Sequence, residues 1–214
     1  GVEIEGGSDV TSTGSATITI NGTANNVAGS DGVEVSDAGT LITSVTGNIS
    51  ITGSTIGSTA SDQGVRIQQG ADVTSTGTAL ITIDGNSSDV AGGDGLQIVH
   101  PGTLVTSVNG NVSLTGVSSG NDGVDIGTEA DVISSGTASI TINGTVNNAS
   151  GSDGVEINDT GTVITSVTGN ISITGSTIGG ESTDHGVHID NGADVTSTGT
   201  ALITIDGNSS DVAG

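Results

Sequence analysis

The side chains best able to do chemistry in this sequence are carboxylates. The 214 residues include 24 Asp and Glu, against one Arg or Lys and three His. Six aspartates stand one or two residues ahead of a recurring Gly-Val or Gly-Leu pair: Asp31, Asp62, Asp94, Asp122, Asp153 and Asp184. Oxygen ligands repeated along one edge of a fold suit a hard cation such as calcium.

A structural role explains the same aspartates. Asp followed by Gly favours a turn in which Asp caps its own backbone and Gly takes a positive φ. The glycine-rich nonapeptide of calcium-binding β-rolls is missing from the sequence. The turn is therefore the favoured interpretation. We expect no required cofactor, with calcium as the alternative.

Two histidines, His185 and His188, lie in the sequence DHGVHID, close to Asp184 and Asp190. Residues three apart on a strand face opposite sides. The spacing therefore argues against a shared metal ion and predicts two solvated surface side chains.

The remaining composition excludes several partners. The net charge is −23, and Arg66 is the only Arg or Lys. Nucleic-acid binding needs basic side chains to displace counterions, and anionic membranes attract basic segments, so neither partner is expected. No apolar run of about 18 residues is present that could insert into a membrane. Because aromatic residues and cysteine are absent, Val, Ile and small side chains must fill the core.

These residues are carried on an internal repeat. A new copy starts about every 31 residues, at Gly1, Gly32, Gly64, Gly95, Gly123, Gly154 and Gly186. The block from Gly1 to Gly22 aligns without a gap with the six later blocks, and each block ends in glycine. Variation in length falls in the connectors, as expected if the blocks are packed. Residues 1–214 are therefore interpreted as one solenoid segment and as a fragment of a longer repetitive chain.

Within each block, apolar and polar residues alternate, which is the period of a strand. The inward set of the fourth copy is predicted to be Leu96, Ile98, Leu104, Val112 and Leu114. Three strands per block follow, at about 2–5, 9–14 and 16–21 of the first copy. Bends prevent them from pairing within one block, whereas stacked blocks can pair them in parallel.

The predicted fold is therefore all-β: a parallel β-helix, or β-solenoid, of seven coils with three short strands each. The preference of parallel crossovers favours a right-handed coil. At about 4.8 Å per coil, the rod would be roughly 34 Å long. A longer repeat of four coils is also visible, because DVTSTGTALITIDGNSSDVA occurs unchanged from Asp72 and from Asp194.

Alternate copies differ in a regular way. A position predicted to face inward is Gly14 in the first copy and Val45 in the second, and two residues later Ala16 is matched by Gly47. A constant volume in each core layer would explain this exchange. Asp and Thr alternate at a position predicted to face outward: Asp9, Thr40, Asp72, Thr103, Asp131, Thr162 and Asp194. Threonine would keep like charges apart, so odd and even coils are predicted to be of two types.

The block pattern Gly-Val-x-Ile/Val, then Val-Thr/Ile-Ser, then Ile-Thr/Ser-Ile-x-Gly spans the whole chain. It resembles the β-helical stalks of bacterial filamentous-haemagglutinin-like adhesins and autotransporter passengers. The resemblance implies an extracellular, cell-surface protein that attaches to host cells, matrix or neighbouring cells. We therefore expect a rigid stalk or filament, with further copies or flanking coils stacked end to end.

Two other functions use this kind of fold. Pectate lyases and polygalacturonases need clustered carboxylates and basic or aromatic side chains that hold sugar, so this composition predicts no enzyme. Ice-binding solenoids use flat threonine arrays, and a hydroxyl ladder is predicted on the third strand: Thr19, Ser50, Thr82, Ser113, Thr141, Ser172 and Thr204. Ser alternating with Thr spoils a regular lattice, and hydroxyls suit any exposed sheet. Ice binding and a calcium-stabilised adhesin module are kept as alternative functions.

Overall fold

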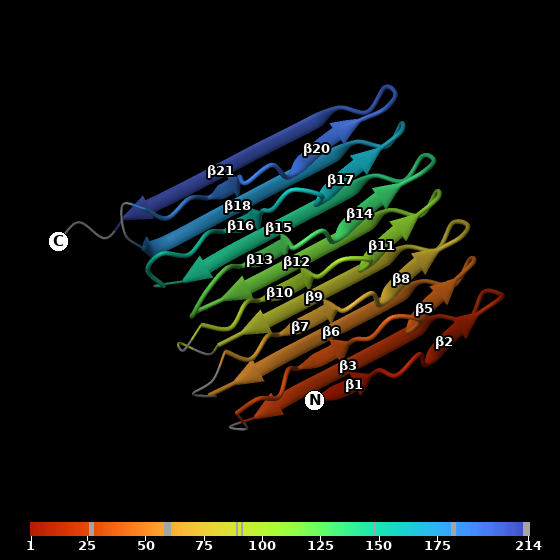
Figure 1. Ribbon diagram of the computed structural model, residues 1–214, viewed down its shortest axis with the longest axis horizontal. Helices are drawn as coiled ribbons and strands as arrows, with labels where there is room; N and C mark the ends of the chain where they lie inside the picture. Colours follow the sequence, from red (N-terminus) through yellow and green to blue (C-terminus); the bar gives the residue numbers. More distant parts are fainter. Residues whose placement is uncertain are drawn as a thin grey trace.

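The fold is the predicted parallel β-solenoid, built from three parallel sheets (Figure 1). The structure is a computed structural model that describes residues 1–25, 28–57, 61–88, 90, 92–147, 149–180 and 183–211. Each strand pairs in parallel with its counterparts in the adjacent coils; Val33, for example, pairs with Val2 and Val65. Repeats about 31 residues apart therefore lie directly on one another.

Each sheet contains seven strands, one from every coil. The first sheet consists of β1 (Val2–Ile4), β4 (Val33–Val35), β7 (Val65–Gln68), β10 (Leu96–Val99), β13 (Val124–Gly127), β16 (Val155–Ile157) and β19 (Val187–Ile189). The second consists of β2 (Asp9–Ser12), β5 (Leu41–Ser44), β8 (Asp72–Ser75), β11 (Leu104–Ser107), β14 (Asp131–Ser134), β17 (Val163–Ser166) and β20 (Asp194–Ser197). The third consists of β3 (Ile18–Asn25), β6 (Ile49–Ile56), β9 (Ile81–Ser87), β12 (Val112–Ser118), β15 (Ile140–Asn147), β18 (Ile171–Gly180) and β21 (Ile203–Asp211).

The core lies between the three sheets and is filled by Val, Ile, Leu and a few Ala. In the fourth coil, the inward side chains of Leu96, Ile98, Val105, Val112 and Leu114 are at most 1% exposed. Strand alternation places their neighbours outward. Each buried aliphatic side chain contributes about 1.5–3 kcal/mol before entropy. Because every coil adds such a layer, neighbouring coils stabilise one another.

The gap-free alignment of the blocks is wrong in the second sheet. Strands of the first and third sheets pair as aligned, whereas Asp9 of β2 pairs with Leu41 of β5 rather than with Thr40. Even coils thus have one more residue in the bend before the second sheet and one fewer in the bend after it. The shift places Val105 in the core, where Leu104 was predicted, and leaves Leu104 partly exposed.

Two kinds of bend before the second sheet explain the two coil types. Odd coils turn on two successive residues with positive φ, such as Gln69 and Gly70 (57° and 82°). Even coils make a longer bend in which His100 and Gly102 (77° and 81°) flank one further residue. Thr103, which follows this bend, is 1% exposed, and its hydroxyl accepts the N–H of Gly70 at 3.0 Å. The contact recurs between Thr40 and Gly7 and between Thr162 and Glu129.

The alternation of Gly14 with Val45 and of Ala16 with Gly47 was predicted to keep the volume of each core layer constant. This prediction is wrong. Val45 is 37% exposed and lies on a bend outside the core. A Cβ on Gly47 would lie 1.9 Å from the carbonyl oxygen of Ala16 in the preceding coil, so only glycine fits there. The threonines predicted outward are the buried ones described above. Asp72 still has an uncharged neighbour on both sides, although these neighbours are leucines.

The third strand is longer than predicted, because it continues through the glycine expected to end each block. There the third sheet passes directly against the start of the first sheet. A Cβ on Gly116 would lie 1.8 Å from the Gly123 carbonyl oxygen, and one on Gly95 would lie 2.3 Å from the Val117 nitrogen. Close backbone contact therefore requires both recurring glycines. The second strands are shorter than predicted, with four residues each.

Beyond these glycines, the third sheet covers a second interior that is largely polar. Thr55, Ser87 and Ser118 point into it and are at most 1% exposed. The Thr55 hydroxyl donates to Ser87 Oγ at 3.1 Å, and the Ser118 hydroxyl donates to the Gly93 carbonyl oxygen at 2.6 Å. The residues that follow the recurring glycine were expected to be connectors, but they are part of the packed solenoid.

The two ends of the stack are formed by β1–β3 and by β19–β21, which each have a paired neighbour on one side only (Figure 1). The right-handed coil stays a prediction from the crossover preference. Within the described residues, no helix has the length and apolar character needed to cross a membrane.

Candidate functional site

A column of mainly acidic side chains runs along the edge between the third and first sheets. Its members are the residues just before each coil-starting glycine, stacked through bonds such as Gly32 N–H to Gln63 O (2.9 Å). We call them the edge column: Asp31, Gln63, Asp94, Asp122, Asp153 and His185. Four of the six calcium candidates therefore lie in one column, and Asp62 and Asp184 lie one residue earlier. All six aspartates are at most 9% exposed.

The four carboxylates of the edge column accept backbone N–H groups of the next coil. Asp122 Oδ1 accepts from the Asp153 N–H, and Asp153 Oδ1 accepts from the His185 N–H, both at 2.6 Å. Equivalent bonds of 2.7 and 3.1 Å join Asp31 to the Gln63 N–H and Asp94 to the Asp122 N–H. A carboxyl group that accepts such a bond ties two coils together, and the bond contributes about 1.5–3 kcal/mol where that group is ionised.

Asp62 and Asp184 bond to the preceding coil instead. Asp62 Oδ1 accepts the Gly29 N–H at 2.8 Å, and Asp184 Oδ1 accepts the Gly151 N–H at 2.7 Å. The predicted turn is wrong in two respects: the aspartates cap a neighbouring coil rather than their own backbone, and the coil-starting glycines do not have positive φ. Calcium binding stays a prediction, and each of the six carboxylates already serves as a hydrogen-bond acceptor.

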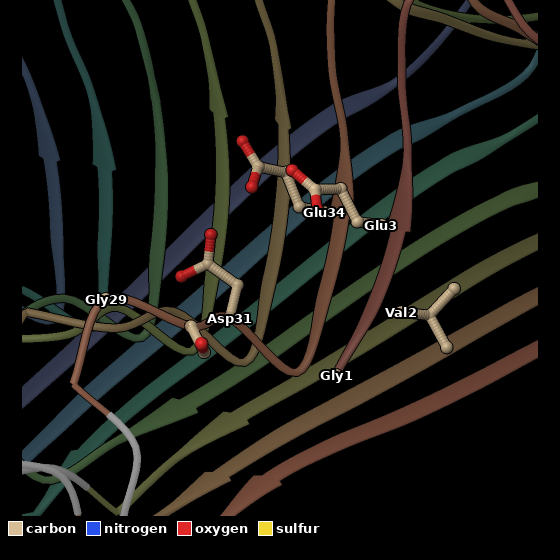
Figure 2. A pocket seen from close by; sticks show the side chains of 7 residues that line it. Gly1, Val2, Glu3, Gly29, Asp31 and Glu34 are labelled. Carbon is tan, nitrogen blue, oxygen red and sulfur yellow. The ribbon is translucent and has the colours of Figure 1, made fainter.

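A second polar column lies beside the first, at the centre of the first-sheet strands. We call it the strand column: Glu3, Glu34, Arg66, Gln97, Asp125, Glu156 and His188. At its N-terminal end, Glu3, Glu34 and Asp31 line a small pocket, and Figure 2 shows the two glutamates side by side with Asp31 next to them. The two columns give this face of the rod its acidic character.

The centre of this face retains protons at neutral pH. Burial, together with nearby carboxylates such as Glu156, raises the pKa of Asp122 to about 9 and that of Asp125 to about 8. Burial also raises the pKa of Asp94 to about 6. Gln97 Nε2 donates to Asp94 Oδ2 at 2.9 Å and to Asp125 Oδ2 at 3.1 Å. The formal net charge therefore overstates the charge that this face carries.

At Asp31, an arginine balances the buried carboxylate. Arg66 Nε lies 3.3 Å from Asp31 Oδ2, and the Arg66 guanidinium also donates to the Gln63 side-chain oxygen. Burial nevertheless raises the pKa of Asp31 to about 6, because desolvation outweighs the attraction of Arg66. A single fixed cation thus neutralises this part of the edge column.

At the other end of the column, the predicted opposite orientation of the two histidines is wrong, although the His185 side chain is exposed as predicted. His185 Nδ1 lies 3.1 Å from Asp153 Oδ1, and His188 Nδ1 lies 2.8 Å from Asp153 Oδ2. The two ring centroids are 4.6 Å apart. The histidines share one side because β19 starts at Val187, so His185 lies in the preceding bend, where strand alternation does not apply. The structure therefore joins both histidines to one carboxylate.

The hydroxyl ladder lies on the outer face of the third sheet, and its members pair in register from coil to coil. The next outward column mixes three residue types: Asn21, Thr52, Asp84, Thr115, Asn143, Thr174 and Asp206. The ladder is thus aligned but chemically irregular. Ice binding stays a prediction.

One inward ladder was missed in the sequence. It runs along the second sheet and contains Ser12, Ser44, Ser75, Ser107, Ser134, Ser166 and Ser197. The Ser107 hydroxyl donates to the Gly110 carbonyl oxygen and so helps to fix the shorter bend of an even coil. The one-residue misalignment had matched these serines with threonines and so hidden the column.

Comparison with known proteins adds no relative to this description. No protein-family model, curated protein or solved structure matches the chain. The chain is accordingly classified by its architecture, as a parallel β-solenoid with three parallel sheets.

Proposed function

We propose that this chain is a rigid structural segment of an extracellular stalk or filament on a bacterial cell surface, and that it is not an enzyme. The observation that supports this most directly is the strand pairing: in all three sheets, each strand pairs in parallel with its counterpart in the next coil. In such a solenoid each coil contacts its neighbours alone, so the rod lengthens by adding coils without changing its cross-section.

The ends of the stack support continuation. Within the described part of the chain, the strands β1–β3 and β19–β21 each leave one edge unpaired. Unpaired edges favour the addition of further strands. Further coils, or a second copy of the chain, would therefore stack there end to end. Attachment to a host cell, matrix or neighbouring cell would use the side faces, where the acidic columns and the hydroxyl ladder lie.

Resistance to proteolysis fits the same role. Arg66 is the only Arg or Lys in the chain. It lies inside β7, and its side chain is 24% exposed and paired with Asp31. A protease needs an accessible, locally opened segment, so we expect trypsin to leave the folded rod intact.

The proposal is tested by lengthening the rod. Residues 64–185 form one four-coil cassette, and tandem duplication of this segment should add about 19 Å per copy at about 4.8 Å per coil. Small-angle X-ray scattering of chains with one to four extra cassettes should show a constant cross-sectional radius and a linear increase in length. Flexible strings of separate particles, or particles that widen, would contradict the proposal.

The alternative functions have assays of their own on the unmodified chain. We expect no thermal hysteresis in freezing solutions and no cleavage of pectic polysaccharides. We also expect calcium chloride to leave the melting midpoint unchanged. A positive result in any one of these assays would replace the stalk by an ice binder, an enzyme or a calcium-stabilised adhesin, respectively.

A further inference from the structure

The contact of Asp153 with His185 and His188 places three metal-ligating side chains together. One ligand atom from each residue lies within 4.8 Å of the others. His185 belongs to the bend before β19, His188 lies in β19, and Asp153 lies one coil earlier, so coil stacking creates the group. We infer that these residues form a binding site for a divalent transition-metal ion of the class Zn²⁺, Co²⁺, Ni²⁺ or Cu²⁺.

The distances between the ligand atoms fit metal ligation. The two Nδ1 atoms lie 3.1 and 2.8 Å from the Asp153 carboxylate oxygens. Ligand atoms about 2.0–2.2 Å from a zinc-like ion are about 3–3.5 Å from one another, so both nitrogen–oxygen distances are close to those around a bound ion. The exposed fraction of the His185 side chain is 53%, which leaves the open coordination positions to water.

The chemistry of the donors selects the class of ion. Two imidazoles and one carboxylate suit Zn²⁺, Co²⁺, Ni²⁺ and Cu²⁺. Calcium instead takes about six to eight oxygen ligands, whereas two of the three donors here are imidazole nitrogens. This site therefore differs in its metal from the calcium sites considered along the edge column.

The site is held in place by its surroundings. Asp153 is 8% exposed, and its Oδ1 accepts the His185 N–H at 2.6 Å. Asp190 Oδ2 lies 3.7 Å from His188 Nε2, and Asp190 Oδ1 is buried without a hydrogen-bond partner among the residues that the structure describes. A carboxylate behind a ligating histidine orients the ring and raises its basicity. At 3.7 Å the pair is an ion-pair contact, and Asp190 enters the proposal as the positioning residue that would accept the His188 Nε2–H when the metal binds.

The four-coil repeat supplies a comparison within the same chain. It aligns Asp31, Gln63 and Arg66 with the three proposed ligands. In that copy the Arg66 guanidinium lies 3.3 Å from the Asp31 carboxylate. A buried carboxylate is costly unless a positive charge faces it. Arg66 is the only Arg or Lys in the chain, so Asp153 faces two imidazoles instead of a guanidinium, and a metal ion bound there would supply the fixed positive charge.

Isothermal titration of the chelator-treated chain with zinc chloride tests the site. We expect saturable binding of one ion per chain, unaffected by calcium chloride, and ligand-field bands typical of nitrogen and oxygen ligands with cobalt(II). The double variant His185→Gln/His188→Arg carries the residues of the other copy. It should fold, by circular dichroism, and bind zinc at least about 100-fold more weakly, given that loss of an outer partner alone costs about 10–100-fold. The control His100→Gln should bind as the parent does.

The reverse exchange tests the geometry independently. Gln63→His/Arg66→His places two histidines beside Asp31, and this variant should bind two ions per chain. Asp190→Asn should weaken binding about tenfold without abolishing it. Failure of the parent chain to take up zinc, or uptake that is unchanged in His185→Gln/His188→Arg, would overturn the site. Neither result would bear on the stalk, which the cassette experiment tests separately.

Discussion

Replacing Val105 by alanine should destabilise the rod much more than the same replacement of its neighbour Leu104. The Val105 side chain is fully buried in the core, whereas Leu104 faces outward and is partly exposed. The comparison is informative because the gap-free alignment of the repeat predicts the opposite order. It therefore tests the one-residue shift that distinguishes odd from even coils.

The expected magnitude follows from the atoms removed. Valine to alanine deletes two methyl groups, or about 1.6 kcal/mol at about 0.8 kcal/mol per group. The cavity left in a layer closed by rigid sheets raises the loss to about 2–3 kcal/mol. Leu104→Ala removes more atoms, but from a partly exposed site, and should cost less than about 1 kcal/mol. The difference between the variants is then about 1–2 kcal/mol.

Urea unfolding followed by far-ultraviolet circular dichroism measures this difference, because the chain has no aromatic residue to serve as a fluorescent probe. With a slope of about 2 kcal/mol per molar urea, Val105→Ala should lower the midpoint by about 1 M or more, and Leu104→Ala by less than about 0.5 M. A lower midpoint for Leu104→Ala than for Val105→Ala would refute the register.

Three further predictions concern the bends, the glycines and the acidic face. Gly95→Ala should cost more than about 3 kcal/mol in urea unfolding, because its Cβ would lie 2.3 Å from the Val117 nitrogen; a loss below about 1 kcal/mol would contradict this contact. Thr103→Val should cost about 1–3 kcal/mol, since it leaves the Gly70 N–H without its acceptor. An unchanged urea midpoint would show that Thr103 does not stabilise the even bend. The raised pKa of Asp122, from 3.8 to about 9, means that the folded state binds more protons than the unfolded state between these values. The free energy of unfolding should therefore fall as pH rises from about 5 to about 9, and a midpoint that rises over this range at constant ionic strength would contradict the burial of this carboxylate.

The architecture could be predicted because its signal is redundant along the chain. Glycine followed by Val or Leu starts every coil, and Ile or Val recurs at matching positions. Residues such as Ile83 and Leu114, which pair in register, are therefore recognisable from sequence spacing alone. The spacing also predicts the pairing partners, because in a solenoid each strand pairs with its counterpart in the next coil.

The register of the second sheet could not be predicted in the same way. Even coils transfer one residue from the second bend to the first, which leaves the total length of the block unchanged. The true alignment is distinguished from the gap-free one by contacts in the folded chain, such as the hydrogen bond of the buried Thr103 and the pairing of Asp9 with Leu41. Likewise, the sequence shows a glycine at position 95 but not whether positive φ or lack of space requires it.

The candidate site illustrates a further limit. Strand alternation was applied to His185, which lies outside the strand, and so the shared carboxylate of Asp153 was missed. The four-coil repeat aligns Gln63 and Arg66 with His185 and His188, and this correspondence was the one sequence feature that related the two histidines to each other. Contacts between coils depend on stacking, which sequence periodicity predicts, and on bend geometry, which it does not.

The most direct test of the account is the distance between stacked copies of one residue. The chain has no cysteine, so pairs of spin labels can be placed in the hydroxyl ladder, one label at Thr19 and the other at Thr141, Ser172 or Thr204. Pulsed electron paramagnetic resonance should give distances that increase by about 4.8 Å per coil, from about 19 to about 29 Å. Distances that do not increase in these steps would show that the copies are not stacked in register and would contradict the solenoid on which the stalk depends.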